Sequence, residues 1–356
     1  MKYWDQKTVK KIREGYYSAV YFNRTKYILE QEGNLVSVTM QIFQWQDEST
    51  LCGVNEVIEL FQAGVGSWRN NKWISQCHKL QVSALQDGDL VARGESVMHI
   101  TGPYVYFAHL ESLYLGILAR RTMVATNTCH VVKAARGKPV FFFADRFDDF
   151  LNQEGDGYAA HVGGATGVCT SAHASRWNGV PVGTIPHALI AVNGGDTVTT
   201  VRLFAKHVPN VNVIALVDFD NDCVGTSLAV ARALGKKLWG VRLDTASDTV
   251  DQSLAKTKGD NKNNYGVNPM LVELVQKALN TAGINHVKIL VSGGFNAEKI
   301  ALFEKKRVPV DGYGVGSALI HGNNDFTADI VKVGGKPIAK IGRTYKPNRR
   351  FQTVNL

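Results

Sequence analysis

The sequence predicts an α/β protein with a parallel sheet or (β/α) barrel and a smaller, β-rich module. From Pro139 onward, apolar runs of strand length alternate with amphipathic helices, a pattern typical of parallel sheets and barrels. Before that point, short apolar runs are separated by turns that contain glycine, which indicates the smaller module. The chain has 356 residues, which is enough for one large and one small domain.

The N-terminal module is expected to mix helices and strands. The alternation in 36–44 (VSVTMQIFQ) predicts a half-buried strand. Residues 55–63 predict a short helix that Asn55 caps. Residues 80–102 predict short strands joined by Asp-Gly and Arg-Gly turns, and 104–136 have helical spacing, with a second helix that closes at Gly137.

The barrel region is predicted from seven apolar runs. Strands buried on both faces read as continuous apolar runs, as these do. Asp196, Asn268 and Asn296 are placed to cap the helices between them. The tail then predicts a hairpin turned by Gly334-Gly335, which should return to the N-terminal module because isolated hairpins are marginally stable. The seven runs are 140–145, 163–168, 180–185, 212–220, 237–244, 287–294 and 310–317.

Charge and composition limit the classes of function. The formal net charge is +9, but the chain has no long Lys/Arg block, so we expect no nucleic-acid partner. An anionic small substrate would explain the charge, and a solvated basic surface is the alternative. The five cysteines form no CxxC pair, which argues against a zinc site or a disulfide framework. The N-terminus has no signal-peptide core and no 18-residue apolar stretch occurs, so we expect a cytoplasmic protein without a membrane partner.

Two glycine-rich tips follow successive strands of the predicted barrel. The first tip is Ser292-Gly293-Gly294, and the second runs from Gly314 through Gly316 to Ser317. Glycine lets the backbone approach a ligand closely, and helix N-termini favour anions. Phosphates often bind in the loops after the last two strands of such barrels. One tip alone would be read as a tight turn, but two successive tips with hydroxyl residues predict a phosphate site.

Charged residues stand at the carboxyl ends of the other predicted strands, where barrel enzymes hold their chemistry. Carboxylates and phosphate oxygens are natural ligands of Mg²⁺, and arginine grips phosphate or carboxylate with two prongs. Each acid alone would be read as a cap or a surface ion pair, and a lone histidine as a packed residue. Their shared position instead predicts a site for a polyphosphate, a sugar and a divalent cation. The strand-end residues are Asp145, Arg146, Thr184, His187, Asp218, Asp220, Arg242 and Asp244.

Several stretches resemble nicotinate phosphoribosyltransferases, which belong to the type II phosphoribosyltransferases together with quinolinate phosphoribosyltransferase. The stretches occur in the same order over most of the chain: YFNRTKYIL (21–29), GESVMHITGP (94–103), GTIPHAL (183–189), VRLDT (241–245), VSGGF (291–295), GYGVGS (312–317) and DIVKVGGKPIAKIGR (329–343).

The resemblance implies a more detailed architecture and a reaction. The fold would be an irregular (β/α) barrel with an N-terminal α/β sandwich domain completed by the C-terminal tail. The domains would then be 1–137, 138–320 and the returning tail 321–356. The reaction would be the transfer of phosphoribosyl from phosphoribosyl pyrophosphate to nicotinate in NAD biosynthesis. Family members commonly form dimers, so the resemblance also implies a homodimer or a higher homo-oligomer.

The resemblance also implies roles for single residues. The two tips would hold the 5′-phosphate, while Asp218, Arg242 and Asp244 would lie near the ribose, the pyrophosphate and Mg²⁺. Many members couple the reaction to ATP through a phosphorylated histidine, and His187 is the matching position. The catalytic set would thus be His187, Asp218, Arg242 and Asp244.

The pyridine base would lie by Arg146, through its carboxylate, and near Tyr21. The family often has two adjacent arginines here, whereas Arg146 is followed by Phe147 and two acids, so the resemblance does not specify how the base is recognised. Two alternatives stay open: quinolinate phosphoribosyltransferase, which needs more cations than this, and a non-catalytic phosphate sensor, which need not keep the metal-handling acids.

Overall fold

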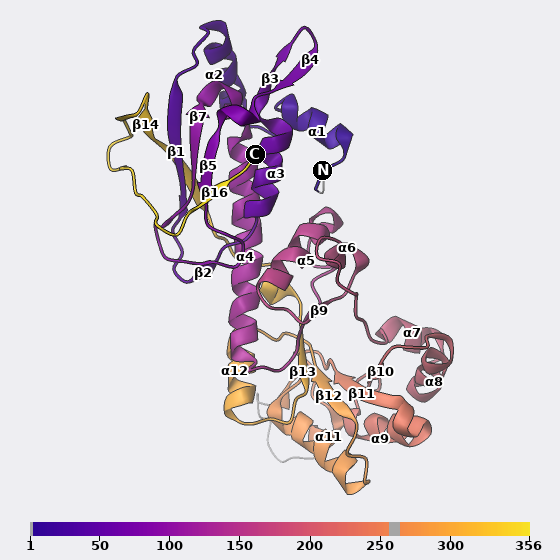
Figure 1. Cartoon of the computed structure of the whole chain (residues 1–356). Helices are drawn as coiled ribbons and strands as arrows, with labels where there is room; N and C mark the ends of the chain where they lie inside the picture. The colour runs from indigo at the N-terminus through magenta and orange to yellow at the C-terminus, as the bar shows by residue number, and fades with distance from the viewer. Residues whose placement is uncertain (1–2, 256–263) are drawn as a thin grey trace. The chain divides into compact units, whose positions relative to one another are not determined.

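The computed structural model describes residues 3–255 and 264–356. The chain divides into two compact units, Met1–Thr126 with His321–Leu356, and Asn127–Ile320. Figure 1 shows both units, and the colour ramp shows that the first unit combines the two ends of the chain. The boundary between the units falls inside the long helix α4 (Glu111–Ala134).

The first unit is built on a six-stranded antiparallel sheet with the strand order β15-β14-β1-β7-β5-β16. Strand β14, from the tail, pairs with β1, from the N-terminal region, and Gln41 lies opposite Asp329 in that register. Gly334 (φ 55°) and Gly335 (φ 78°) make the turn between β14 and β15. The expected return of the C-terminal tail is therefore confirmed. The strands are β1 (Ser37–Gln44), β5 (Gln81–Ala84), β7 (Ser96–Pro103), β14 (Phe326–Val333), β15 (Lys336–Pro337) and β16 (Gln352–Val354).

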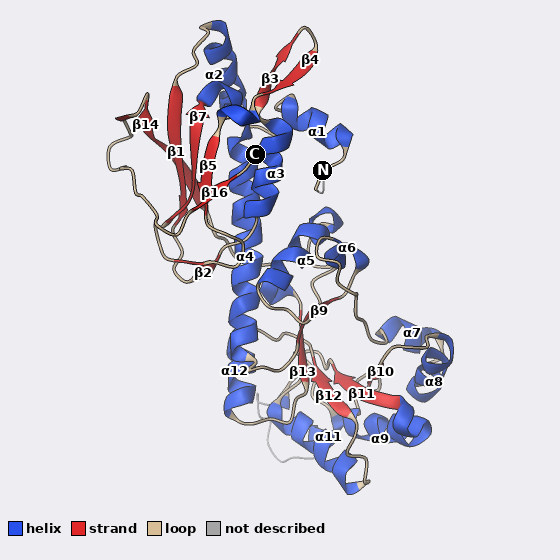
Figure 2. Ribbon diagram, in the orientation of Figure 1, coloured by secondary structure: helices blue, strands red, loops and turns tan. Residues whose placement is uncertain are grey.

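The core of this unit lies between the sheet and the helices α3 (Val54–Gly64) and α4, as Figure 2 shows. Ile42 of β1, Leu60 of α3 and Leu118 of α4 are fully buried members of one apolar cluster. Burial of such side chains contributes about 1.5–3 kcal/mol each, which stabilises the sandwich.

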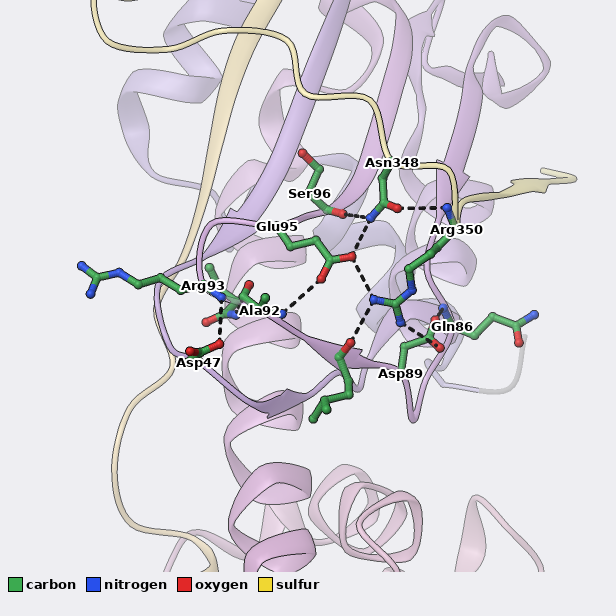
Figure 3. Close-up of polar contacts among 11 residues, drawn as sticks. Asp47, Gln86, Asp89, Ala92, Arg93, Glu95, Ser96, Asn348 and Arg350 are labelled. Carbon is green, nitrogen blue, oxygen red and sulfur yellow. Dashed lines mark hydrogen bonds and ion pairs between the residues drawn. The ribbon is translucent and has the colours of Figure 1, made fainter.

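Strand β1 is buried on both faces, so the prediction of a half-buried strand was wrong. The tail crosses the face opposite the core: the Gln41 side chain donates to the Thr344 carbonyl (3.3 Å) and accepts from the Lys346 N–H (2.7 Å). Figure 3 shows the polar contacts that hold the next part of the tail, at Asn348 and Arg350, against the rest of the first unit. Asn348 donates to the Ser96 carbonyl, and the Arg350 guanidinium lies 2.9 Å from Glu95.

Two helix predictions in this unit need correction. Helix α3 begins at Val54 after Gly53 (φ 101°), and the Val54 N–H donates to Asp87 rather than to a capping Asn55. The region 104–136 holds one 24-residue helix, α4, instead of two. No proline lies between Glu111 and Ala134, so nothing in that stretch stops helix propagation.

Smaller elements complete the unit. They are α1 (Gln6–Arg13), α2 (Val20–Gln31), β2 (Ser49–Thr50), β3 (Gly66–Arg69), β4 (Lys72–Ser75) and β6 (Leu90–Val91), with short 3-10 helices at Cys77–Lys79, Tyr104–Tyr106 and Ala108–Leu110.

The second unit contains a curled parallel sheet with the strand order β10-β11-β12-β13-β8-β9, which confirms the irregular barrel. Six of the seven expected runs form its strands. The exception is 180–185, for which the described residues provide a single bridge, Val168 to Pro181. Pro181 has no N–H to donate, and beside this bridge the Val182 N–H donates to the Val168 carbonyl (2.8 Å) without a regular strand being formed. The strands are β8 (Val140–Phe142), β9 (Gly167–Val168), β10 (Val213–Leu216), β11 (Leu238–Leu243), β12 (Lys288–Val291) and β13 (Gly312–Val315).

Helices connect these strands, and the expected caps are present. Asp196 accepts from the Thr199 N–H, Asn268 from Leu271 and Asn296 from Lys299. Among the described residues, no helix combines the length and the apolar character needed to cross a bilayer. The helices are α5 (Gln153–Val162), α6 (Ser171–Ser175), α7 (His187–Val192), α8 (Thr197–His207), α9 (Cys223–Leu234), α10 (Gln252–Ala255), α11 (Pro269–Thr281) and α12 (Ala297–Lys305), with 3-10 turns at Phe150–Asn152, Gly235–Lys237 and Ser317–Leu319.

Candidate active site

Two adjoining hollows open at the carboxyl ends of the parallel strands in the second unit. The first, of about 120 Å³, is lined by both glycine-rich tips, and the second, of about 370 Å³, by Thr184 and His187. Both hollows share four lining residues. Eleven of the thirteen residues predicted for the site line one hollow or the other. The shared residues are Phe143, Arg146, Arg242 and Asp244.

The glycine tips have the backbone geometry that the sequence suggested. Gly293 (φ 84°) and Gly294 (φ 68°) lie in the left-handed region, which side chains other than glycine rarely adopt. At Gly314, a Cβ would lie 2.7 Å from the Phe143 ring, so only glycine lets β13 and the segment after β8 approach this closely. Helix α12 begins just after the first tip, with Asn296 as its N-cap. The first hollow therefore combines exposed backbone with a helix N-terminus, a combination suited to phosphate.

Arg242 and Asp244, at the end of β11, form a connected group with Ser292 of the first tip. The Ser292 hydroxyl donates to Asp244 Oδ1 (2.7 Å), and Arg242 Nη1 lies 3.7 Å from Asp244 Oδ2. Burial lowers the pKa of Arg242, but it stays a cation because its reference value is above 12. Its Nε is buried without a partner among the described residues. These contacts hold the Arg242 guanidinium in place and leave its Nε donor for a ligand.

His187 lies on the rim of the second hollow, in contact with Asp218. Its Nε2 is 3.0 Å from Asp218 Oδ2, and burial raises the pKa of Asp218 above the usual range. His187 is the first residue of helix α7 and does not follow a strand, because 180–185 is not one. Asp218 follows β10 and is connected to the second hollow by its contact with the His187 imidazole, which lines that hollow.

The two predicted metal ligands fit Mg²⁺ in chemistry. Asp218 Oδ1 is buried with no hydrogen-bond partner in the described part of the chain, and the nearby Asp244 contributes to its raised pKa. In residues 3–255 and 264–356, no group of three or more metal-binding side chains occurs. Mg²⁺ commonly binds through one or two carboxylates, substrate phosphates and waters, so two acids beside a phosphate-binding hollow suffice.

Other residues of the site had escaped the sequence reasoning. Phe143 and Phe147 line the hollows, and so does Cys169, which directly follows β9. Arg146 lies over the Phe147 ring (5.7 Å to its centroid) and forms no ion pair among the described residues. Cys169 could have been found from its place after the run 163–168, but that run is glycine-rich and gave a weak signal.

Tyr21 is the one predicted residue outside this unit. It lies on α2 of the first unit, 63% exposed, with its ring against Phe22 (4.3 Å between centroids). Its role toward the pyridine ring stays a prediction.

Comparisons with known proteins agree with this architecture. Residues 19–122 match the family described as quinolinate phosphoribosyl transferase, N-terminal domain. A nicotinate-nucleotide pyrophosphorylase from Pyrococcus furiosus is 32% identical, with a TM-score of 0.80, and the match covers 97% of this chain and 84% of that one. Human nicotinic acid phosphoribosyltransferase, at 15% identity and a TM-score of 0.67 over 92% of this chain and 77% of its own, shares the fold.

A curated relative gives a similar result. A nicotinate phosphoribosyltransferase of Mycobacterium tuberculosis (strain ATCC 25618 / H37Rv) is 29% identical over 270 residues, which cover 73% of this chain and 55% of the relative. The chain spans about half the length of the curated relatives it matches.

Proposed function

We propose that this chain is a nicotinate phosphoribosyltransferase. The chain belongs to the type II phosphoribosyltransferase family, together with the nicotinate and quinolinate phosphoribosyltransferases. It would join nicotinate to phosphoribosyl pyrophosphate and release nicotinate mononucleotide and pyrophosphate. The observation that carries this proposal is the meeting of two glycine-rich strand ends with Arg146, Arg242 and Asp244 around adjoining hollows. That set offers backbone N–H groups for a phosphate and cations for a leaving group.

The two hollows suit the two ends of the sugar substrate. The 5′-phosphate would bind the tips around Gly293 and Gly316 in the first hollow. The anomeric carbon and pyrophosphate would then lie toward the second hollow, near Arg242, with the pyridine ring against Phe143 and its carboxylate at Arg146. Because Arg146 has no acidic partner among the described residues, its guanidinium is available to a ligand.

Catalysis would rest on charge and on positioning. Departure of pyrophosphate leaves positive character on the ribose and negative charge on the leaving group. Arg242 would offset the charge of the leaving group, and the carboxylates of Asp218 and Asp244 would help to stabilise positive charge on the ribose. The pyridine nitrogen already carries a lone pair, so no side chain has to remove a proton. Holding that nitrogen in line with the anomeric carbon lowers the barrier further.

We also propose Mg²⁺ as cofactor and ATP as a co-substrate. Asp218 and Asp244 would hold Mg²⁺, which would offset pyrophosphate charge. His187 would accept the phosphoryl group of ATP: with Nε2 engaged by Asp218, the Nδ1 lone pair is left as the nucleophile.

The likeness to the family further supports a homodimer or a higher homo-oligomer in the cytoplasm. Helix α2 of the first unit presents Val20, Tyr21, Tyr27 and Ile28 to solvent, each more than half exposed. A second copy of the chain is the partner we propose for this apolar face, with a test by analytical ultracentrifugation. A monomer at micromolar concentration would contradict it.

The test of the function is turnover of purified protein with phosphoribosyl pyrophosphate, Mg²⁺ and one pyridine at a time. We expect nicotinate mononucleotide from nicotinate. The value of kcat/KM for quinolinate and for nicotinamide should be at least tenfold lower than for nicotinate, because with either base a polar group of the base or of the site would be left without a partner. Equal or better turnover of quinolinate, with release of carbon dioxide, would assign the alternative function. No turnover with any pyridine would overturn the transferase proposal.

A further inference from the structure

A carboxylate forms part of the wall of the second hollow, where an anionic base is expected to bind. Asp145 and Cys169 line this hollow together with Arg146 and Arg242. The two residues come from neighbouring strands, since Asp145 follows β8 and Cys169 follows β9, which pair at Phe142 and Val168. The acid therefore belongs to the strand-end layer that holds the site.

Contacts on both its side chain and its backbone hold Asp145 in place. The Cys169 thiol donates to Asp145 Oδ1 (3.1 Å). Burial and this acid raise the pKa of the Cys169 thiol to about 12, so the thiol keeps its proton and remains a donor. The Gln153 amide donates to the Asp145 carbonyl (3.0 Å), and the Thr170 hydroxyl in turn donates to Gln153 (3.0 Å). These contacts keep the carboxylate in the wall.

The negative charge of this carboxylate has no cation in direct contact. Within the described ranges, Asp145 forms no salt bridge, and a thiol is only a weak donor. Of the two guanidinium groups in the hollow, Arg242 is engaged with Asp244, Ser292 and the Ile185 carbonyl. One guanidinium, that of Arg146, is left for an anionic base, and it can grip one carboxylate.

Nicotinate and quinolinate differ by one carboxylate. Nicotinate carries one, and quinolinate carries a second beside the ring nitrogen. A second carboxylate in this hollow would meet Asp145 instead of a cation. Like charges brought together in a partly desolvated site repel strongly, and such a repulsive element is a common source of specificity.

We propose that Asp145 is the residue that excludes pyridine dicarboxylates, and that Cys169 is the positioning residue that keeps its carboxylate turned into the wall. This inference rests on the proposed function, since it concerns the base that the same site accepts. The alternative is that Asp145 only ties the two strand ends together. That structural role would affect stability and would leave the choice of base unchanged.

The test compares how quinolinate and nicotinate bind to Asp145→Asn and to a matched control, Asp149→Asn. Asp149 lies in the following loop, caps a short helix at Leu151 and does not line either hollow. Quinolinate is measured as a competitive inhibitor against nicotinate, so the result does not depend on its decarboxylation. In Asp145→Asn the ratio of quinolinate Ki to nicotinate KM should fall by roughly tenfold to a hundredfold. In Asp149→Asn it should stay within about twofold of wild type, because exposed, screened charges act weakly.

Variants of Cys169 test the positioning role. Cys169→Ala, which removes the donor, should lower the same ratio by a few fold, and Cys169→Ser, which restores a donor, should return it to the wild-type value. If Asp145→Asn fails to fold, Asp145→Leu supplies the same charge removal with an apolar contact to Cys169.

If a folded Asp145 variant has the wild-type ratio of quinolinate Ki to nicotinate KM, this proposal is overturned. The proposed function still stands in that case, provided that wild type turns over nicotinate. Wild type that binds quinolinate as tightly as nicotinate also overturns it. Wild type without turnover of any pyridine overturns both.

Discussion

Replacing Gly294 with alanine should weaken binding of phosphoribosyl pyrophosphate about tenfold and leave nicotinate binding unchanged. Gly294 lines the first hollow at φ 68°, and a Cβ there would meet no atom within 4 Å. The added methyl would therefore stand in the space that we assign to the 5′-phosphate. Gly316 is a poorer site for this test, since a Cβ there would lie 2.8 Å from the Phe143 carbonyl and would disturb the fold first.

Two free-energy terms have to be separated in this variant. A side chain in the left-handed region costs about 1–2 kcal/mol of stability wherever it occurs. Crowding of the phosphate is a separate term, and about 1.4 kcal/mol of lost binding raises KM tenfold. Gly283→Ala is the matched control: Gly283 also has a left-handed backbone (φ 72°) and open space around a Cβ, but it follows helix α11 and lies outside both hollows.

The assay combines urea denaturation with steady-state kinetics in both substrates. Both variants should lose a similar free energy of unfolding. Only Gly294→Ala should raise KM for phosphoribosyl pyrophosphate, with KM for nicotinate within about twofold of wild type. If the two variants have the same KM for phosphoribosyl pyrophosphate, the first hollow is not the phosphate site.

Three further predictions concern other residues. His187→Ala should abolish both ATP stimulation and the acid-labile label that wild type acquires from γ-labelled ATP, while ATP-independent synthesis persists; a wild type that acquires no label and ignores ATP would refute the phosphohistidine role. Lys26→Met should lower the free energy of unfolding by about 2–4 kcal/mol in urea denaturation. The buried Lys26 ammonium donates to two backbone carbonyls at 2.7 and 2.8 Å and pairs with Glu30 (3.4 Å), and all three acceptors would lose this donor. The exposed Lys10→Met should change it by less than about 0.5 kcal/mol, and equal losses would contradict the reasoning. Burial raises the pKa of Glu111 to about 7, so the stability that its neutral form contributes is present below the unfolded value near 4.5 and is lost as pH rises through 7. Glu111→Gln should accordingly be more stable than wild type at pH 8 and equally stable at pH 4, and a difference independent of pH would refute the shift.

The sequence predicted which residues the structure brings together wherever a strand and its turn are specified locally. Apolar runs that end in glycine-rich or charged residues predicted both tips, Arg242 and Asp244, because the carboxyl ends of parallel strands meet at one edge of a sheet. The helix caps at Asp196, Asn268 and Asn296 were also predicted correctly, since a cap is a contact between residues three apart. A local pattern of this kind survives in almost any tertiary setting.

Contacts between distant segments decided the rest. Alternation in β1 predicted one exposed face, but residues about 300 positions later cover that face through Gln41. The run 180–185 looked like a strand, yet only the sheet shows that it has no full partner there. A hydrophobic pattern records the environment of each residue and does not record which segment supplies that environment.

The amino-acid sequence by itself determined the class of fold, the order of most strands and helices of the second unit and the position of the two glycine-rich tips. The tertiary structure alone decided that Asp218 reaches the site through His187, and that Cys169 holds Asp145 in the wall beside Arg146. The physical reason is that hydrogen bonds between side chains depend on distances of about 3 Å between segments far apart in the chain. Those distances are fixed only when the packed sheet sets the register of each strand end against its neighbour.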